Sequence, residues 1–537
     1  MDAITAQLLR EFDRRSAAAG APLALNDLCD ALAGAAPPYW RACANGLQQR
    51  GAAVVAVALL ERAVMRMPAE PALRLYLGQA LAKLGDHAAA ETVLRQVATP
   101  DREEAVLDLA AALRHQGKLS QAAGTMADLL RQRPADAEIT LGRLRFINGC
   151  QRQPLAAEMC ERELARGLRH PHLLEFAGRM ALALGRFDVA RRHYFDALES
   201  GIDLNSHFVL QALSGTQRYT DAAHPDFALF ESHLERPGYS ALAQASIRFA
   251  LGKAYDDVGN FAAAAAALRA GNALVRGTLS WTRANWNTTV QQLMAARYPA
   301  QQPADGSFTP VFVVGLPRSG TTLVADRLGR HPRLRNRGEL NLVPYLDRWV
   351  SGSGQAQNPK LLREVSRFAS AQLVQDDAPA QFYLDKNPLN FRFLSLIAAV
   401  LPQSRIIYCR RNRRDNALSI WNQFFARGDD NGYAYDFADI AAFADSCEQL
   451  MRHWSRSLPL PLHEVEYEKL IEAPEQAFGE LGRFLGLDDF DPLAAPAAGT
   501  HVITTSSAWQ ARQPIYSRSI ERWRAYAPYV PELEALL

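Results

Sequence analysis

Apolar positions in the first 300 residues recur with the period of an α-helix, and glycines interrupt the pattern at regular intervals. The interrupting residues are Gly51, Gly85, Gly117, Gly185 and Gly259, and position 151 falls where another glycine is expected. The first two intervals, 34 and 32 residues, have the length of a helical hairpin repeat. The pattern therefore predicts pairs of antiparallel helices separated by turns.

Small and large residues hold equivalent places around these glycines. A small residue precedes the turn glycine, as at Gly78, Gly178 and Gly252. A large residue follows it, as at Leu94, Tyr194 and Leu268. This frame resembles the tetratricopeptide repeat, in which small residues let two helices approach closely. We therefore expect a superhelical solenoid, with a degenerate unit at 200–240. Its concave surface is expected to hold a peptide or protein, the alternative being a purely structural or dimerising role.

The period changes after a Pro-, Gly- and Gln-rich linker near residues 299–310. Short β-rich runs now alternate with helical patterns, at 311–315, 382–386, 405–409 and 463–467. This alternation predicts an α/β domain with a parallel sheet, whose ligands bind beyond the carboxyl ends of the strands. The predicted organisation is an α-solenoid over residues 1–300 followed by the α/β domain over 301–537.

The stretch "VVGLPRSGTTL" leads an apolar strand into an anion-binding loop. Gly315 and Gly320 are spaced as in a nucleotide-binding P-loop, but Thr321 stands where that loop carries a lysine. Arg318 supplies a positive charge instead. The next helix is expected to present its first N–H groups to a bound anion, and the residues concerned are Ser319, Gly320, Thr321 and Thr322.

Two phosphate-binding motifs carry a resemblance to sulfotransferases. "PRSGTT" resembles the loop that holds the 5′-phosphosulfate of 3′-phosphoadenosine 5′-phosphosulfate (PAPS) in that P-loop-related fold. "RIIYCRRNRRDNALSIW" resembles the family's 3′-phosphate motif, with Arg411 and Ser419 as the binding pair. The neighbouring arginines would otherwise indicate a solvated or nucleic-acid-binding patch, and they are Arg410, Arg413 and Arg414.

The chain further resembles tyrosylprotein sulfotransferases and their bacterial relatives that carry tetratricopeptide repeats. Glu339 lies 21 residues beyond Arg318, where that family keeps its catalytic glutamate. The resemblance also implies a lysine at a strand end, a tyrosine near the adenine, a transition-state serine and a basic cofactor contact, at Lys386, Tyr467, Ser507 and Arg522. Gln423 and Leu340 depart from the animal enzymes, which carry an arginine and an acid at these positions.

The implied reaction needs a base and positive charge but no metal ion. Sulfuryl transfer resembles phosphoryl transfer, in which in-line positioning and charge stabilisation do most of the catalysis. We expect Glu339 to take the acceptor proton, with His331 as the weaker alternative. Arg318 and Lys386 would hold the transferring group, and Ser507 would add a neutral donor.

Composition restricts the partners. The net charge of +2 over 537 residues gives no overall attraction to nucleic acid, and no apolar run is long enough to span a membrane. The N-terminal segment lacks the layout of a signal peptide, and the six cysteines are scattered without a Cys-x-x-Cys pair. We therefore expect a cytoplasmic protein.

The sequence also allows two alternative functions, a kinase and a non-catalytic scaffold. An ATP-dependent kinase would need a lysine at position 321 and an acidic metal ligand at a strand end, where the sequence has Lys386 and Arg411. A non-catalytic repeat scaffold would have no reason to keep both phosphate motifs. For a sulfotransferase, a protein tyrosine is the preferred acceptor, and a carbohydrate, a lipid or a small phenol is the alternative.

Overall fold

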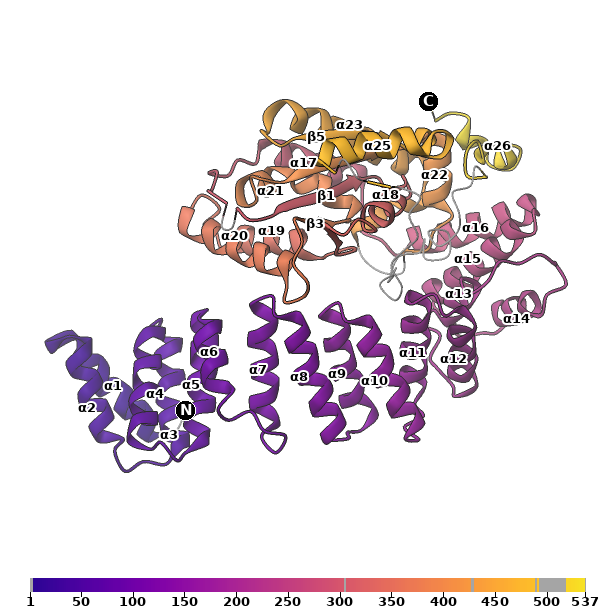
Figure 1. Ribbon diagram of the computed structural model, residues 1–537. Coiled ribbons are helices and arrows are strands. Elements are labelled where there is room, and N and C mark those ends of the chain that lie inside the picture. Colours follow the sequence, from indigo (N-terminus) through magenta and orange to yellow (C-terminus); the bar gives the residue numbers. More distant parts are fainter. Residues whose placement is uncertain (1–2, 304–305, 426–428, 488–489, 492–517, 537) are drawn as a thin grey trace. The chain divides into compact units, whose positions relative to one another are not determined.

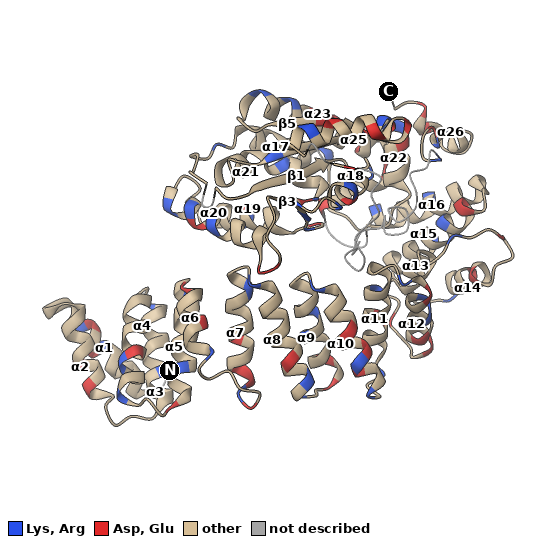
Figure 2. Cartoon of the chain, viewed as in Figure 1, with Lys and Arg blue, Asp and Glu red and all other residues tan. Residues whose placement is uncertain are grey.

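The computed structural model describes residues 3–303, 306–425, 429–487, 490–491 and 518–536. Its contacts define two compact units (Figure 1): residues 1–159 with 375–377, and residues 160–374 with 378–537. Each unit is described by itself. Charges of both signs are interspersed over the helices and the α/β domain (Figure 2). None of the helices in the described ranges is both long enough and apolar enough to cross a bilayer.

The first unit is a row of antiparallel helices, as the repeat pattern predicts. Gly85 ends one helix in the left-handed conformation (φ 91°), and Gln151 adopts the same conformation (φ 59°) where the pattern expects a glycine. The helices are α1 Ala3–Ala19, α2 Ala21–Ala31, α3 Pro37–Gln49, α4 Ala53–Arg66, α5 Pro71–Leu84, α6 His87–Leu94, α7 Glu103–His115, α8 Leu119–Gln132 and α9 Ala137–Gly149, and α10 Gln153–Ala165 runs into the second unit.

Close helix contacts explain the small residues of the repeat. A Cβ at Gly178 would lie 2.6 Å from the ring of Tyr194, and one at Gly252 would lie 2.6 Å from Leu268. The degenerate stretch forms two short helices, α13 Val209–Ser214 and α14 Pro225–Leu234. The regular hairpins around it are α11 Pro171–Ala183 with α12 Phe187–Glu199, and α15 Ala241–Asp257 with α16 Phe261–Arg276.

The α/β domain is built on a five-stranded parallel sheet in the order β2-β3-β1-β4-β5. The strands are β1 Thr309–Gly315, β2 Leu334–Asn336, β3 Phe382–Asp385, β4 Arg405–Arg410 and β5 Leu462–Glu466. Four of them occupy the predicted runs, and β2 was not predicted. The predicted α-solenoid followed by a parallel α/β domain is confirmed.

Helices cover both faces of the sheet. Val311 and Val313 of β1 pack with α18 and α25, whereas Phe312 and Val314 face a second core formed with α19 to α23. The helices are α17 Arg283–Ala295, α18 Thr321–Leu328, α19 Leu342–Gly352, α20 Pro359–Val374, α21 Leu394–Val400, α22 Arg413–Trp421, α23 Phe437–Ser457, α24 Tyr467–Glu472, α25 Pro474–Leu485 and α26 Trp523–Tyr526, with 3-10 turns η1 Pro388–Phe393, η2 Asp429–Tyr435 and η4 Pro531–Leu533.

The last hairpin shares a core with the α/β domain. Phe249 of α15 and Leu268 of α16 belong to the same buried cluster as Phe312 of β1. Trp286 of α17 stacks on Phe443 of α23 with ring centroids 4.6 Å apart. The apolar core is therefore continuous across the linker near residue 300.

Candidate active site

The loop after β1 is held in a tight conformation at the start of α18. Arg318 has a positive φ of 69°, and Ser319 Oγ donates to the carbonyl of Leu316 at 2.7 Å. Gly320 follows at φ 94°, and a Cβ there would lie 2.6 Å from Cδ2 of Tyr467. Glycine is strongly favoured at this position, because a side chain would strain the backbone and displace the Tyr467 ring.

The two predicted phosphate motifs meet in space. Arg318 Nε donates to Ser419 Oγ of α22 at 3.1 Å, and Arg411 Nη1 donates to the carbonyl of Arg318 at 3.0 Å. Asn416, which is buried in α22, donates to the carbonyl of Pro317 at 3.0 Å. Loop and helix are therefore fixed to each other, although about 100 residues separate them in sequence.

Arg411 has capacity for a further acceptor. Its guanidinium lies 4.7 Å over the ring of Tyr467, and its Nη2 donates to the carbonyl of Ser519 at 2.6 Å. Its Nε is buried and has no hydrogen-bond partner among the described residues. A buried donor of this kind is unfavourable unless a ligand satisfies it, and an anion at this point would do so.

Ser519 is a site residue that sequence reasoning missed. Besides accepting from Arg411, it hydrogen-bonds Tyr467 through the two hydroxyl groups at 2.7 Å. It lies between Ser507 and Arg522, the two residues that the family resemblance singles out near the C-terminus, and this was the available signal. Of these two, Ser507 lies outside the described residues.

A second cluster follows the strands β2 and β3. The Lys386 ammonium forms an ion pair with Glu339 Oε1. The Lys386 side chain is 4% exposed and the Glu339 side chain is 40% exposed. The ammonium is therefore buried, and the carboxylate that it pairs with faces solvent. The Lys386 N–H also donates to the carbonyl of Gly338 at 2.8 Å, which joins the two strand ends.

Asp385, which sequence reasoning also missed, supports this pair from below. It is fully buried, and its carboxylate accepts from the Leu340 N–H at 3.1 Å and from Asn390 Nδ2 at 3.0 Å. Burial is the main reason why its pKa is raised to about 7. The hydrogen bond to Leu340 holds the backbone immediately after Glu339.

The five predicted residues that carry these contacts appear in strand order across the sheet. Glu339, Lys386, Arg318, Arg411 and Tyr467 follow the carboxyl ends of β2, β3, β1, β4 and β5. With neighbouring strands about 4.8 Å apart, the row extends over about 19 Å. An acid therefore lies at one end of the row, a cluster of basic side chains in the middle and an aromatic ring at the other end.

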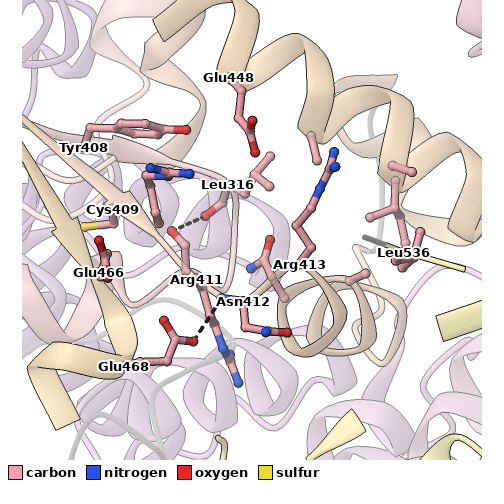
Figure 3. Close-up of a pocket in the computed structure, with 17 residues that line it drawn as sticks. Leu316, Tyr408, Cys409, Arg411, Asn412, Arg413, Glu448, Glu466, Glu468 and Leu536 are labelled. Atoms are coloured by element: carbon pink, nitrogen blue, oxygen red, sulfur yellow. Dashed lines mark hydrogen bonds between the residues drawn. The ribbon is translucent and has the colours of Figure 1, made fainter. Parts of the chain in front are cut away.

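A cavity of about 310 Å³ adjoins the cluster between β4, α22 and α23 (Figure 3). Ser319 and Arg411 contribute to its wall, and the Asn412 N–H donates to Glu468 at 3.0 Å beside it. The neighbouring arginines are paired with other groups: Arg410 with Glu464, Arg413 with Asp445, and Arg414 over the ring of Trp523.

Comparisons with known proteins agree with this geometry. Residues 310–492 match the sulfotransferase family, and residues 47–103 match the tetratricopeptide repeat. The α/β domain belongs to the sulfotransferase family.

Relatives with curated or provisional names match this chain at low identity. An uncharacterised protein of Aquifex aeolicus is 24% identical over 92% of this chain and 68% of its own length. Protein-tyrosine sulfotransferase 2 of Gallus gallus is 24% identical over 43% of this chain and 66% of its own length, so the match spans just under two thirds of that relative. A solved sulfotransferase of Mycobacterium avium is 13% identical over 58% of this chain and 94% of its own, with a TM-score of 0.27.

Two further candidates of the sulfotransferase domain lie elsewhere. His331 precedes β2, at the opposite end of that strand from Glu339, and its buried Nδ1 accepts from the Arg333 N–H at 3.2 Å. Arg522 forms an ion pair with Asp256 of α15 at 2.6 Å. The remaining loop residues begin α18, with Thr321 buried and Thr322 half-buried.

Proposed function

We propose that this protein transfers the sulfuryl group of PAPS to the hydroxyl of a tyrosine in a peptide or protein. The observation that carries the proposal is the row of strand-end residues from Glu339 to Tyr467 across the sheet. The row offers separate sites for the proton of the acceptor hydroxyl, the sulfuryl group, a phosphate and the adenine ring.

The donor would occupy the middle and the far end of the row. The α18 N-terminus and Arg318 suit the 5′-phosphosulfate, because a helix start and a guanidinium both favour anions. Arg411 and Ser419 suit the 3′-phosphate, since the buried Nε of Arg411 needs an acceptor. The ring of Tyr467 offers a flat surface for the adenine.

The acceptor would approach from the β2 side. The tyrosine oxygen attacks sulfur, the bond from sulfur to the bridging phosphate oxygen breaks, and the proton passes to Glu339. The products are the tyrosine sulfate ester and adenosine 3′,5′-bisphosphate. A phenol titrates near 10, well above a carboxylate, so the proton must move as the new S–O bond forms. The Lys386 ammonium stabilises charge on the departing oxygen.

The tyrosine acceptor is supported by the curated relatives named protein-tyrosine sulfotransferase. A peptide acceptor also suits the solenoid, since such repeats commonly present an extended binding surface. We therefore propose that the repeats hold the polypeptide that carries the tyrosine.

Donor and acceptor are tested separately. Adenosine 3′,5′-bisphosphate is expected to raise the melting temperature of the full chain, and Mg-ATP is expected to leave it unchanged. The reverse result would contradict the donor assignment and favour a kinase. Labelled PAPS is then offered to tyrosine peptides, phenols, oligosaccharides and lipids, and label on any class except peptides would contradict the tyrosine assignment.

The role of Glu339 is tested with Glu339→Gln. Loss of a general base is expected to lower kcat by about 10²- to 10⁴-fold, while the affinity for adenosine 3′,5′-bisphosphate stays the same. Glu364→Gln, at an exposed acid on α20, is the control and should retain full activity. A Glu339→Gln enzyme with wild-type kcat would exclude this residue as the base.

A further inference from the structure

We propose that Asp256, on the last helical hairpin, is a positioning residue for donor binding because it anchors the segment that completes the nucleotide site. This inference rests on the proposed function. The segment is residues 518–536, here called the C-terminal strap. It contacts the donor cluster through Ser519, and two carboxylates from different parts of the second unit hold it: Asp415, which is buried, and Asp256, which is 20% exposed.

The strap reaches the donor cluster through Ser519. The carbonyl of Ser519 accepts from Arg411 Nη2 at 2.6 Å, and its hydroxyl bonds the Tyr467 hydroxyl at 2.7 Å. One residue of the strap thereby fixes both the arginine assigned to the 3′-phosphate and the ring assigned to the adenine. Displacing Ser519 would release both side chains.

The first anchor belongs to the sulfotransferase domain. Asp415 of α22 is buried, and its carboxylate accepts from the N–H groups of Glu521 and Trp523 at 2.7 and 2.9 Å. These bonds hold the strap backbone against α22. They do not engage the strap's side chains.

The second anchor is Asp256, at the end of α15. It forms an ion pair with Arg522 at 2.6 Å and accepts from the hydroxyl of Tyr526, which is fully buried. The arginine and aspartate side chains are only 31% and 20% exposed, so this pair is better shielded from water than an ordinary surface pair. The last hairpin therefore holds the strap through its side chains.

The buried apolar residues of the strap, Tyr526, Val530 and Leu533, all come after Arg522 in sequence, so they do not directly hold the part that carries Ser519. The strap's α-helix, α26, has four residues, too few to be stable without external contacts. Arg522 comes only three positions after Ser519, a reach of about 10 Å at most, so a shift at the ion pair moves the serine. A further ion pair to the strap joins Arg269 and Glu532 at 2.6 Å. Its side chains are more exposed, at 49% and 41%, and Glu532 lies farther from Ser519 in sequence than Arg522 does.

The neighbouring residue provides a matched control. Asp257 lies beside Asp256 on α15 and is 16% exposed, but its ion pair with Lys253 at 2.7 Å and its hydrogen bond from the Tyr219 N–H at 3.1 Å both lie within the repeats. By isothermal titration calorimetry with adenosine 3′,5′-bisphosphate, Asp256→Asn is expected to weaken binding about tenfold. Asp257→Asn should bind as the wild type does, and Asp256→Glu should recover part of the loss. In the transfer assay, Asp256→Asn should raise KM for PAPS and leave kcat unchanged.

The outcomes separate the two proposals. If the wild type does not bind the bisphosphate, the proposed function fails. If the wild type binds and Asp256→Asn binds within twofold of it, the positioning role is wrong. If Asp256→Asn does not fold, Ser519→Ala and Arg522→Gln are measured instead. Weakened binding in both supports the strap contact, and wild-type binding in either contradicts it.

Discussion

Gly320 joins the loop proposed to bind the phosphosulfate to the ring of Tyr467, and Gly320→Ala tests whether that contact matters for binding. The substitution places a Cβ 2.6 Å from Cδ2 of the ring, well inside van der Waals contact, at a backbone φ of 94°. Because Gly320 is fixed between β1 and α18, the ring is expected to move instead of the loop. Its movement breaks the hydrogen bond to Ser519 and the stacking with Arg411.

The magnitude follows from those two contacts. A cation–π contact contributes about 0.5–1 kcal/mol, and a hydrogen bond contributes about 0.5–1.5 kcal/mol. Together they predict that binding of adenosine 3′,5′-bisphosphate weakens about 5- to 70-fold. The left-handed backbone adds a loss of folding free energy of about 1–2 kcal/mol, which does not by itself affect binding.

Gly259→Ala separates the two effects. Gly259 has a φ of 81°, but a Cβ there would meet nothing within 4 Å. Both variants should lose similar stability in urea unfolding, and only Gly320→Ala should lose affinity in calorimetry. Unchanged affinity in Gly320→Ala would refute the contact argument, as would an equal loss of affinity in Gly259→Ala.

Two further predictions concern the core of the site and the packing of the repeats. Burial raises the pKa of Asp385 to about 7, so between about pH 4 and 7 the folded protein keeps a proton that the unfolded chain has lost. The free energy of unfolding therefore falls as pH rises through that window. Urea midpoints should therefore fall less steeply over that window in Asp385→Asn, and parallel profiles would contradict the prediction. Gly178→Ala should destabilise the fold by about 1–3 kcal/mol because its Cβ would lie 2.6 Å from the Tyr194 ring. Gly142→Ala on α9, where a Cβ meets nothing within 4 Å, should stabilise it by up to about 1 kcal/mol, and equal unfolding midpoints would refute the packing argument.

Local patterns predicted most of the architecture. The repeat pattern was readable because packing produces it: a small residue on one helix of a hairpin faces a large one on the other, as Gly252 faces Leu268. Strands of four or more residues were also predictable, and these are β1, β3, β4 and β5. β2 was missed because three residues, Leu334–Asn336, carry no readable alternation, and the strand exists through its pairing with β3.

The candidate site was predictable where a motif is contiguous and unpredictable where distant segments meet. Arg318, Arg411 and Ser419 lie in motifs, and the structure brings them together. Arg522 was assigned to the nucleotide, but its partner is Asp256, 266 residues away in sequence. No local pattern marks such a pairing, because it depends on which repeat packs against the sheet.

The sheet order has a consequence for how the enzyme could be switched off. β2 is an edge strand of three residues, and Glu339 follows it, whereas the loops proposed to bind the nucleotide follow the interior strands β1 and β4 and the longer edge strand β5. Short edge strands open at a smaller free energy than the strands inside a sheet. A brief fraying of this edge would carry the proton acceptor away while the nucleotide stays bound. Catalysis and donor retention would then respond differently to heat or mild denaturant, with turnover lost first.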